Sequence, residues 1–253
     1  MMTDERRDDL RKRIETVARY KDIAGATVLE IGADAKGFAA QMLLDAGAAR
    51  VLSSNYGERW TPGAFGGIER IRLDARRIGE DIAPASIDLV FGIAVLEHID
   101  GLAEFFAGAK QALAPGGLFF VQGGPIWTCA VGHHVGVKGE KGHYRFGIPG
   151  ANPIPPWAHL AHDRETLPGF LVEQGVWPAD ARLIADFVYG SPKLNRVGYR
   201  SMRALFDASP LTAIDRIEGA FKPPPADMMA RIASGPHGGQ ERYDVAGITF
   251  VAS

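Results

Sequence analysis

Five of the seven histidines of this 253-residue chain fall between positions 133 and 162. Histidine titrates near neutral pH and can act as a general base or a metal ligand. We therefore predict His133 and His134 as catalytic candidates, and we add His98 from an earlier apolar run. Adjacent histidines usually point in different directions, so we expect no shared metal ion on the pair. Loop polarity is the competing interpretation of His133 and His134, and a structural role is that of His98.

Side chains that could bind a substrate surround these histidines. Trp127 offers a stacking face, and His143, Tyr144 and Arg145 follow one another nearby. The planar guanidinium of Arg145 suits an anionic group. Packing for Trp127 and a solvated loop for the other three are the alternatives. Residues 123–168 contain many turn formers and little periodicity, which is typical of a functional loop or lid.

A glycine-containing turn follows the first apolar run. Gly32 follows residues 27–31, and Gly37 lies five residues later at the start of a predicted helix. A dinucleotide-binding turn needs another glycine two residues after the first, so that a pyrophosphate can approach the backbone. Asp34 occupies that place, and its carboxylate repels phosphate. The turn therefore argues against NAD and against phosphate ligands generally, but not against a phosphate-free ligand with a cationic centre.

Alternating strands and helices must position these residues. Short β-branched runs predict strands, and apolar residues three or four apart predict helices. The expected strands are 27–31, 50–54, 68–73, 87–91, 118–122, 211–217 and 245–252; the expected helices are 4–20, 38–46, 102–113, 179–189 and 199–207. This order predicts a doubly wound, Rossmann-like α/β fold with seven strands, mostly parallel, and helices on both faces. We expect an antiparallel edge pair and ligands beyond the carboxyl ends of the strands.

Three runs resemble motifs of the class I S-adenosylmethionine-dependent methyltransferases. Residues 28–32 (VLEIG) resemble the first motif, and residues 86–99 (SIDLVFGIAVLEHI) resemble the fourth-strand motif with its Leu-Glu-His ending. Residues 113–121 (LAPGGLFFV) resemble the turn before the fifth strand. All three occur in the order of the family, and the likeness covers about residues 26–122.

The resemblance implies one methyltransferase domain over residues 1–253. We expect its parts to be an N-terminal helix (1–24), a donor-binding core (25–122), a His- and Pro-rich substrate or lid insertion after strand five (123–198), and a C-terminal helix with edge strands (199–253). The length of the chain suits one large α/β domain that carries such an insertion.

The resemblance also implies S-adenosyl-L-methionine as the methyl donor. Positions that match the family's cofactor-binding residues are Glu30, Gly32, Asp34, Gly37, Asn55, Asp74, Ala75, Gly92, Ile93 and Ala94. Glu30 and the following turn would face the methionine part and the sulfonium, and Asp74 would lie near the adenine. Asn55 stands where the family usually has an acid for the ribose hydroxyls, so it lacks a charge-assisted bond. Asp34 and Lys36 replace glycines of the motif.

Composition limits the partners. The formal net charge is −2, which gives no general excess of positive charge for nucleic acid, so we expect none as partner. No run approaches about 18 apolar residues, so we expect no membrane partner. The single Cys129 fits a reducing cytoplasm, and residues 3–13 are too charged for a targeting signal. The sequence leaves a homodimer open.

We expect methyl transfer to oxygen or nitrogen of a small polar acceptor, such as a sugar or glycan-related metabolite, because the insertion is polar. A base within reach would take the proton that the acceptor loses. One alternative is a binding or regulatory protein that kept the fold and lost catalysis, as Asp34 and Asn55 suggest. A nicotinamide oxidoreductase is a second, opposed by the missing middle glycine. A macromolecular acceptor gains nothing from the near-neutral charge.

Overall fold

The computed structural model describes residues 4–239 and 241–253, which form two compact units. Of the described residues, 4–123, 204–217 and 249–253 form the sheet unit, and 124–203, 218–239 and 241–248 form the insert unit. This grouping differs from the expected single domain with an insertion at 123–198, because residues 218–248 also join the insert unit. None of the helices in the described ranges is long and apolar enough to cross a membrane.

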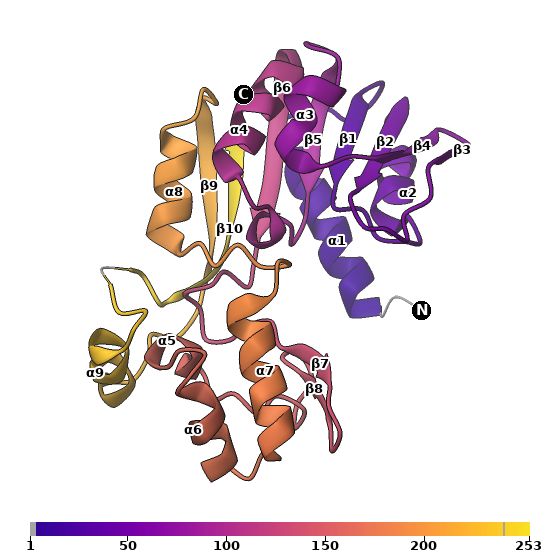
Figure 1. Ribbon diagram of the computed structural model, residues 1–253. Helices are drawn as coiled ribbons and strands as arrows, with labels where there is room; N and C mark the ends of the chain where they lie inside the picture. Colours follow the sequence, from indigo (N-terminus) through magenta and orange to yellow (C-terminus); the bar gives the residue numbers. More distant parts are fainter. Residues whose placement is uncertain (1–3, 240) are drawn as a thin grey trace. The chain divides into compact units, whose positions relative to one another are not determined.

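The sheet unit is built on a large, mostly parallel sheet (Figure 1). Its strands are β1 Thr27–Ile31, β2 Arg50–Asn55, β3 Gly63–Phe65, β4 Ile68–Arg72, β5 Ile87–Gly92, β6 Leu113–Gly123, β9 Ala213–Ala220 and β10 Val245–Ala252, in the spatial order β3-β4-β2-β1-β5-β6-β10-β9. Strands β1, β2, β4, β5 and β6 run parallel to one another. The order of the parallel strands reverses between β1 and β5, which is where ligands bind in such sheets.

The expected doubly wound α/β fold is confirmed, with two differences in detail. Within residues 4–239 and 241–253 the sheet has eight strands rather than seven, because the short β3 pairs antiparallel with β4. Strand β6 begins at Leu113, since a register shift between Ile87 and Leu89 absorbs the Pro-Gly-Gly turn. The expected antiparallel edge pair is present: Thr212 and Ser253 exchange backbone hydrogen bonds of 2.8 and 2.9 Å.

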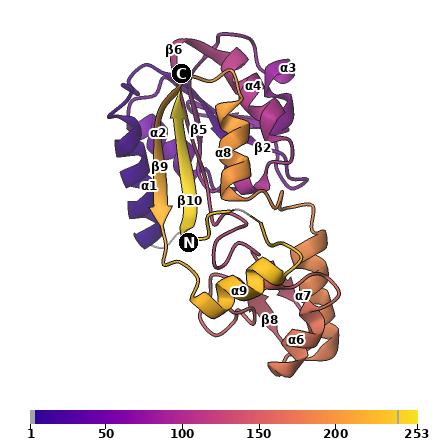
Figure 2. The same cartoon turned by 90° about the vertical axis from the view of Figure 1, so that its left-hand side faces the viewer.

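Helices cover both faces of this sheet, with α1 and α2 on one face and α3 and α4 on the other (Figure 2). The bounds are α1 Asp4–Val17, α2 Phe38–Asp45, α3 Ile78–Asp81, α4 Leu102–Ala112 and α8 Tyr199–Asp207, with 3-10 turns η1 Ala75–Arg77 and η2 Leu96–His98. Beneath α1 and α2, Phe91 and Phe120 stack with ring centroids 6.1 Å apart. On the other face, Phe206 from α8 stacks on Phe250 at 4.0 Å. The apolar core on each face of the sheet is thus formed by residues that are distant in sequence.

The described part of the insert unit contains a β-hairpin and four helices. These elements are β7 Gly136–Lys138, β8 His143–Arg145, α5 Ala158–Ala161, α6 Leu167–Glu173, α7 Pro178–Gly190 and α9 Ala226–Ser234. They enclose a separate apolar core with Leu167, Leu171 and Ile184 fully buried. The prediction of little regular structure in residues 123–168 was therefore wrong in part. Its apolar residues pack against partners far along the chain, which local periodicity does not reveal.

Candidate active site

Glu30 is a buried acid on β1, beside the point where the strand order reverses. Its side chain is 3% exposed, and the Ser53 hydroxyl donates to Glu30 Oε2 at 2.7 Å. Burial raises the pKa of Glu30 to about 7. Ser53 and Arg70 act to lower that pKa, and the nearby Asp34 acts to raise it. A positive charge at this position would favour the ionised carboxylate.

The turn after β1 is fixed by Asp34. Its Oδ1 accepts the backbone N–H of Lys36 at 2.8 Å, and its Oδ2 accepts that of Phe38 at 3.0 Å. These bonds satisfy amide groups at the start of α2, which would otherwise lack partners. Gly37 is in the left-handed region with φ 70°, which favours glycine. Asp34 therefore has a structural task in addition to any contact with a ligand.

Asn55, at the end of β2, is bonded to the same turn. Its Nδ2 donates to the carbonyl of Ala33 at 2.7 Å, and its Oδ1 accepts the N–H of Gly57 at 2.8 Å. A carbonyl cannot donate and a backbone N–H cannot accept, so these two partners determine the orientation of the amide.

Arg70 on β4 reaches the turn from the other side of β2. Its Nη2 donates to the carbonyl of Ala35 at 3.1 Å, and its guanidinium lies 4.9 Å from the ring centroid of Trp60. Trp60 is itself held by an Nε1 hydrogen bond to the carbonyl of Ile71. Sequence reasoning missed Arg70 and Trp60, because neither belongs to a recognisable motif.

Asp74 follows β4 and opens the turn η1. It forms an ion pair with Arg76 at 2.6 Å and accepts the backbone N–H of Arg76. The hydrogen bond from the Arg76 side chain holds the pKa of Asp74 below its ordinary value. Ala75 is half-buried as the first residue of η1.

The segment after β5 folds back over the ends of β1 and β5. The Val95 N–H donates to the carbonyl of Gln122 at 3.0 Å, and a Cβ on Gly32 would lie 2.7 Å from Val95 Cγ2. A Cβ on Gly92 would lie 2.9 Å from Val95 Cγ1. Both glycines are therefore required for this close packing. Ile93 is half-buried, and the exposed Ala94 adopts a left-handed backbone with φ 53°.

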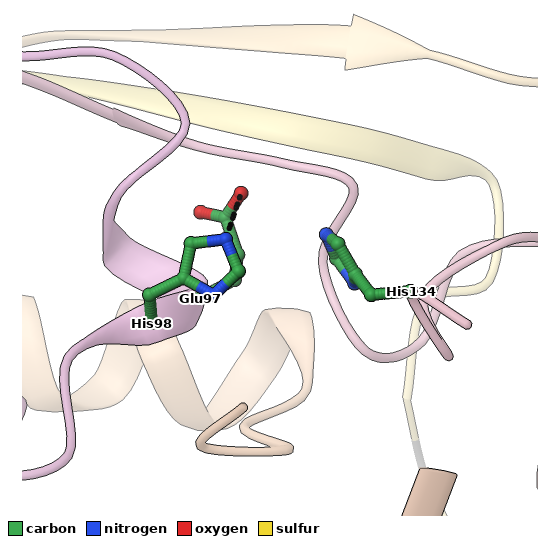
Figure 3. Close-up of side chains that lie close together, drawn as sticks. All are labelled: Glu97, His98 and His134. Carbon is green, nitrogen blue, oxygen red and sulfur yellow. Dashed lines mark ion pairs between the residues drawn. The ribbon is translucent and has the colours of Figure 1, made fainter. Parts of the chain in front are cut away.

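His98 ends the turn η2 and is largely exposed. Its Nε2 lies 3.8 Å from Oε1 of the buried Glu97, as the dashed line in Figure 3 marks. The same turn packs closely on β6, because a Cβ on Gly123 would lie 2.7 Å from Leu96 Cβ. All the predicted cofactor-binding residues and His98 thus belong to the sheet unit.

In the insert unit, His133 belongs to a buried group of rings with Trp127 and His159. The rings of His133 and His159 contact edge to face at 5.2 Å, and those of Trp127 and His159 at 4.8 Å. His159 Nε2 bonds to the carbonyl of Trp127 at 2.8 Å, and burial lowers the pKa of His159 to about 3. Tyr189 and His237, which sequence analysis had not singled out, complete the group around Trp127.

The two adjacent histidines differ in which ring nitrogen carries the proton. His133 Nδ1 accepts the N–H of Val135 at 3.1 Å, and burial holds the pKa of His133 well below its ordinary value. The lone pair of this neutral ring is therefore already used. His134 Nδ1 lies 2.9 Å from the carbonyl of Gly132, which places the proton on Nδ1 and the lone pair on Nε2. His134 is also buried and has a left-handed backbone with φ 47°.

The remaining predicted substrate residues form strand β8. The Tyr144 hydroxyl donates to Asp180 at 2.8 Å, and Asp180 also accepts the N–H groups of Glu140 and Lys141 at 2.7 and 2.9 Å. Asp180, from α7, thereby fixes the hairpin turn, and sequence analysis had not identified it. His143 and Arg145 are exposed at the two ends of β8. His143 and Arg145 therefore lie exposed on an ordered hairpin rather than in an irregular loop.

The acidic groups of β1 and of the turn after it fit the chemistry of S-adenosylmethionine. That molecule has a cationic sulfonium and no phosphate. The buried Glu30 carboxylate would be stabilised by a positive charge, and Asp34 repels phosphate. The residues present therefore fit this donor better than a dinucleotide.

Comparisons with known proteins agree with this fit. A family model described as "Methyltransferase domain" matches residues 29–121. A structure of an S-adenosylmethionine-dependent methyltransferase from Mesorhizobium loti is 18% identical, with 97% of this chain and 99% of that chain covered and a TM-score of 0.55. A structure of an S-adenosylmethionine-dependent methyltransferase from Archaeoglobus fulgidus is 10% identical. The match covers 97% of this chain and 93% of that chain, with a TM-score of 0.51.

A third structure, of geranyl diphosphate methyltransferase in complex with its donor, is 10% identical, covering 96% and 84%, with a TM-score of 0.53. At such identities the likeness concerns the fold. No curated protein sequence matches the chain. Residues 29–121 thus match a methyltransferase domain model, and the sheet that contains them has the fold of these S-adenosylmethionine-dependent methyltransferase structures.

Proposed function

We propose that this protein transfers the methyl group of S-adenosyl-L-methionine to oxygen or nitrogen of a small polar acceptor, such as a sugar or glycan-related metabolite. The observation that carries the donor assignment is the buried Glu30 carboxylate at the switch point of the sheet. The near-neutral charge of the chain supports a small molecule rather than nucleic acid as partner, and a cytoplasmic setting is part of the same proposal.

On the donor side, Glu30 acts as the counter-charge to the positive end of the ligand. Gly32, Asp34 and Gly37 supply the turn beside it, and Asp74 with Ala75 binds the adenine end. The segment Gly92, Ile93 and Ala94 lines the donor beyond β5. Bound S-adenosylmethionine supplies an already activated methyl group, so holding the reactants in place accounts for much of the remaining task.

On the acceptor side, we assign binding to the insert unit through Trp127, His143, Tyr144 and Arg145. Arg145 and His143 are exposed, and their side chains offer hydrogen-bond donors to a polar acceptor. Trp127 and Tyr144 are engaged by neighbouring side chains, so they shape the unit as well as contacting a ligand.

A hydroxyl must lose its proton as it attacks the methyl group, and a protonated amine must lose one before it attacks, so both call for a base. Of the three candidate histidines, His134 has the suitable tautomer, because its Nε2 has the lone pair. His133 acts by holding the segment around His134, since its own lone pair binds Val135. His98 is the candidate on the sheet unit.

Calorimetric titration of the whole chain with S-adenosylmethionine and its demethylated product tests the donor assignment. We expect saturable heat and a rise in the unfolding temperature with either ligand. No heat and no stabilisation at millimolar donor would refute the assignment. A panel of polyols, sugars and amines, followed by methyl incorporation, then identifies the acceptor.

A binding or regulatory protein without catalysis is the second candidate. The internal bonds of Asp34 and Asn55 favour it, because two positions of the donor motif serve the protein's own backbone. Donor binding with no methyl transfer to any acceptor of the panel would support this candidate over the enzyme.

A further inference from the structure

Asn55 is at the position where the family usually places an acidic residue, yet both ends of its amide are engaged by backbone. Nδ2 donates to Ala33 in the turn after β1, and Oδ1 accepts from Gly57 just beyond β2. We propose that Asn55 is a positioning residue that ties the donor-binding turn to β2, and not the group that grips the ribose of the donor. This inference rests on the proposed donor site.

The turn has reasons to need such a tie. Its carbonyl groups at Ala33 and Ala35 accept from Asn55 and Arg70, which come from β2 and β4. Its amide groups at Lys36 and Phe38 donate to Asp34. In the family motif glycines stand at the positions of Asp34 and Lys36. This turn lacks the glycines of the motif, and side-chain hydrogen bonds from two neighbouring strands fix its conformation instead.

The chemistry of the amide explains why an acid would not serve here. A carboxylate has acceptors only, so it could replace Oδ1 toward Gly57 but not Nδ2 toward Ala33. A carboxylate in place of this amide would bring an anionic oxygen to the Nδ2 position, 2.7 Å from the Ala33 carbonyl oxygen, and the two would repel. A ribose-binding role makes the opposite demand, because a carboxylate accepts from both hydroxyls with stronger, charge-assisted bonds.

Asn55→Asp therefore separates the two roles by the sign of its effect. We expect the Kd for the demethylated donor to rise about tenfold or more in Asn55→Asp, and to rise similarly in Asn55→Ala. If Asn55 bound the ribose hydroxyls, the demethylated donor would instead bind more tightly after Asn55→Asp. Asn195→Asp is the matched control, since it adds the same charge in the insert unit and keeps an acceptor for the N–H of Val197; it should leave the Kd unchanged.

A second ligand sharpens the test. Asn55→Asp should weaken binding of the demethylated donor without its 2′- and 3′-hydroxyls by the same factor, within about threefold. The substitution displaces the turn and does not act on the hydroxyls. If the loss disappears with this analogue, or if Asn55→Asp binds the complete ligand as tightly as the natural chain, the proposal is overturned.

Hydrogen exchange of the ligand-free protein supplies a readout that needs no donor. Amides of residues 33–38 should exchange faster in Asn55→Asp than in the natural chain, while the hairpin 136–145 should not change. Unchanged exchange at 33–38 would overturn the tie even if the protein binds donor. Absence of any binding by the natural chain would instead refute the donor site, and the positioning role of Asn55 with it, so the two failures are distinguishable.

Discussion

Glu30 and Ser53 lie directly opposite each other in the parallel strands β1 and β2, and the Ser53 hydroxyl donates to the Glu30 carboxylate at 2.7 Å. Arg70 continues the same row on β4, opposite Ser53. A buried acid, a hydroxyl and a partly exposed base thus share one face of the sheet beside the donor-binding turn. The arrangement makes the ionisation of Glu30 measurable in both stability and ligand binding.

Glu30→Gln should change how stability depends on pH. Burial raises the pKa of Glu30 from 4.5 to about 7, so the folded state binds the proton more tightly than the unfolded state. The free energy of unfolding of the natural chain should therefore decrease as the pH rises from about 4.5 to 7, by about 3 kcal/mol at most. The amide of the variant keeps an acceptor for Ser53 and cannot ionise, so the variant should be the more stable protein at pH 8. Urea unfolding at pH 5 and 8 measures this, and parallel curves for both proteins would contradict it.

The same substitution should alter discrimination between donor and product. S-adenosylmethionine has a positive sulfur and its demethylated product does not, so ionised Glu30 favours the donor. The donor-to-product affinity ratio of the natural chain should increase from pH 6 to 8. In Glu30→Gln the ratio should stay flat, with donor affinity at pH 8 lower by about tenfold. Titrations with both ligands at the two pH values decide the matter; an equally steep ratio in the variant would exclude Glu30 as counter-charge.

Gly32→Ala should damage the turn beyond β1. Gly32 has φ 76°, and the added Cβ would lie 2.7 Å from Val95 Cγ2. We expect a loss of about 2 kcal/mol or more in the free energy of unfolding, together with weaker donor binding. Adding Val95→Ala should restore part of the stability by removing the clash. Gly169→Ala, on an open face of α6, is the control and should stabilise by up to about 1 kcal/mol. Equal effects at positions 32 and 169 would contradict the packing argument.

Asp180→Ala should loosen the hairpin of the insert unit. Burial acts to raise the pKa of Asp180, but the N–H groups of Lys141 and Glu140 and the Tyr144 hydroxyl outweigh it, so this pKa lies below its ordinary value. The stability it provides is present above about pH 4 and is lost as the pH falls further. We expect Asp180→Ala to lower the unfolding temperature at pH 7 by about 4 °C or more, and Tyr144→Phe, which removes one bond, by less. Equal unfolding temperatures for Asp180→Ala and the natural chain would show that these bonds do not stabilise it.

His133→Ala and His134→Ala should have different consequences. Because His134 has its lone pair on Nε2, its removal should lower kcat about a hundredfold or more once an acceptor is known, with donor affinity unchanged. His133→Ala should mainly lower the unfolding temperature, since His133 is buried and bonded to Val135. Full turnover in His134→Ala would remove it from the chemistry.

The sequence by itself determined the sheet unit. Apolar runs such as residues 27–31 and 87–91 are strands because they are buried on both faces, and their alternation with helices requires parallel pairing. The order of these runs therefore brought Glu30, Asn55, Asp74 and Gly92 to the ends of neighbouring strands. Local pattern was sufficient there because each element carries its own periodicity.

Only the tertiary structure decided what these residues touch. That Asn55 bonds to Ala33, that Arg70 reaches Ala35 across β2, and that Asp180 binds the hairpin are contacts between residues 22, 35 and about 40 positions apart. Such contacts depend on the register of strands and the packing of helices, which residue types do not encode locally. The sequence predicted an insertion at 123–198 but not its separate core, for the same reason, since this core joins residues 154–188 to α9 and Tyr243.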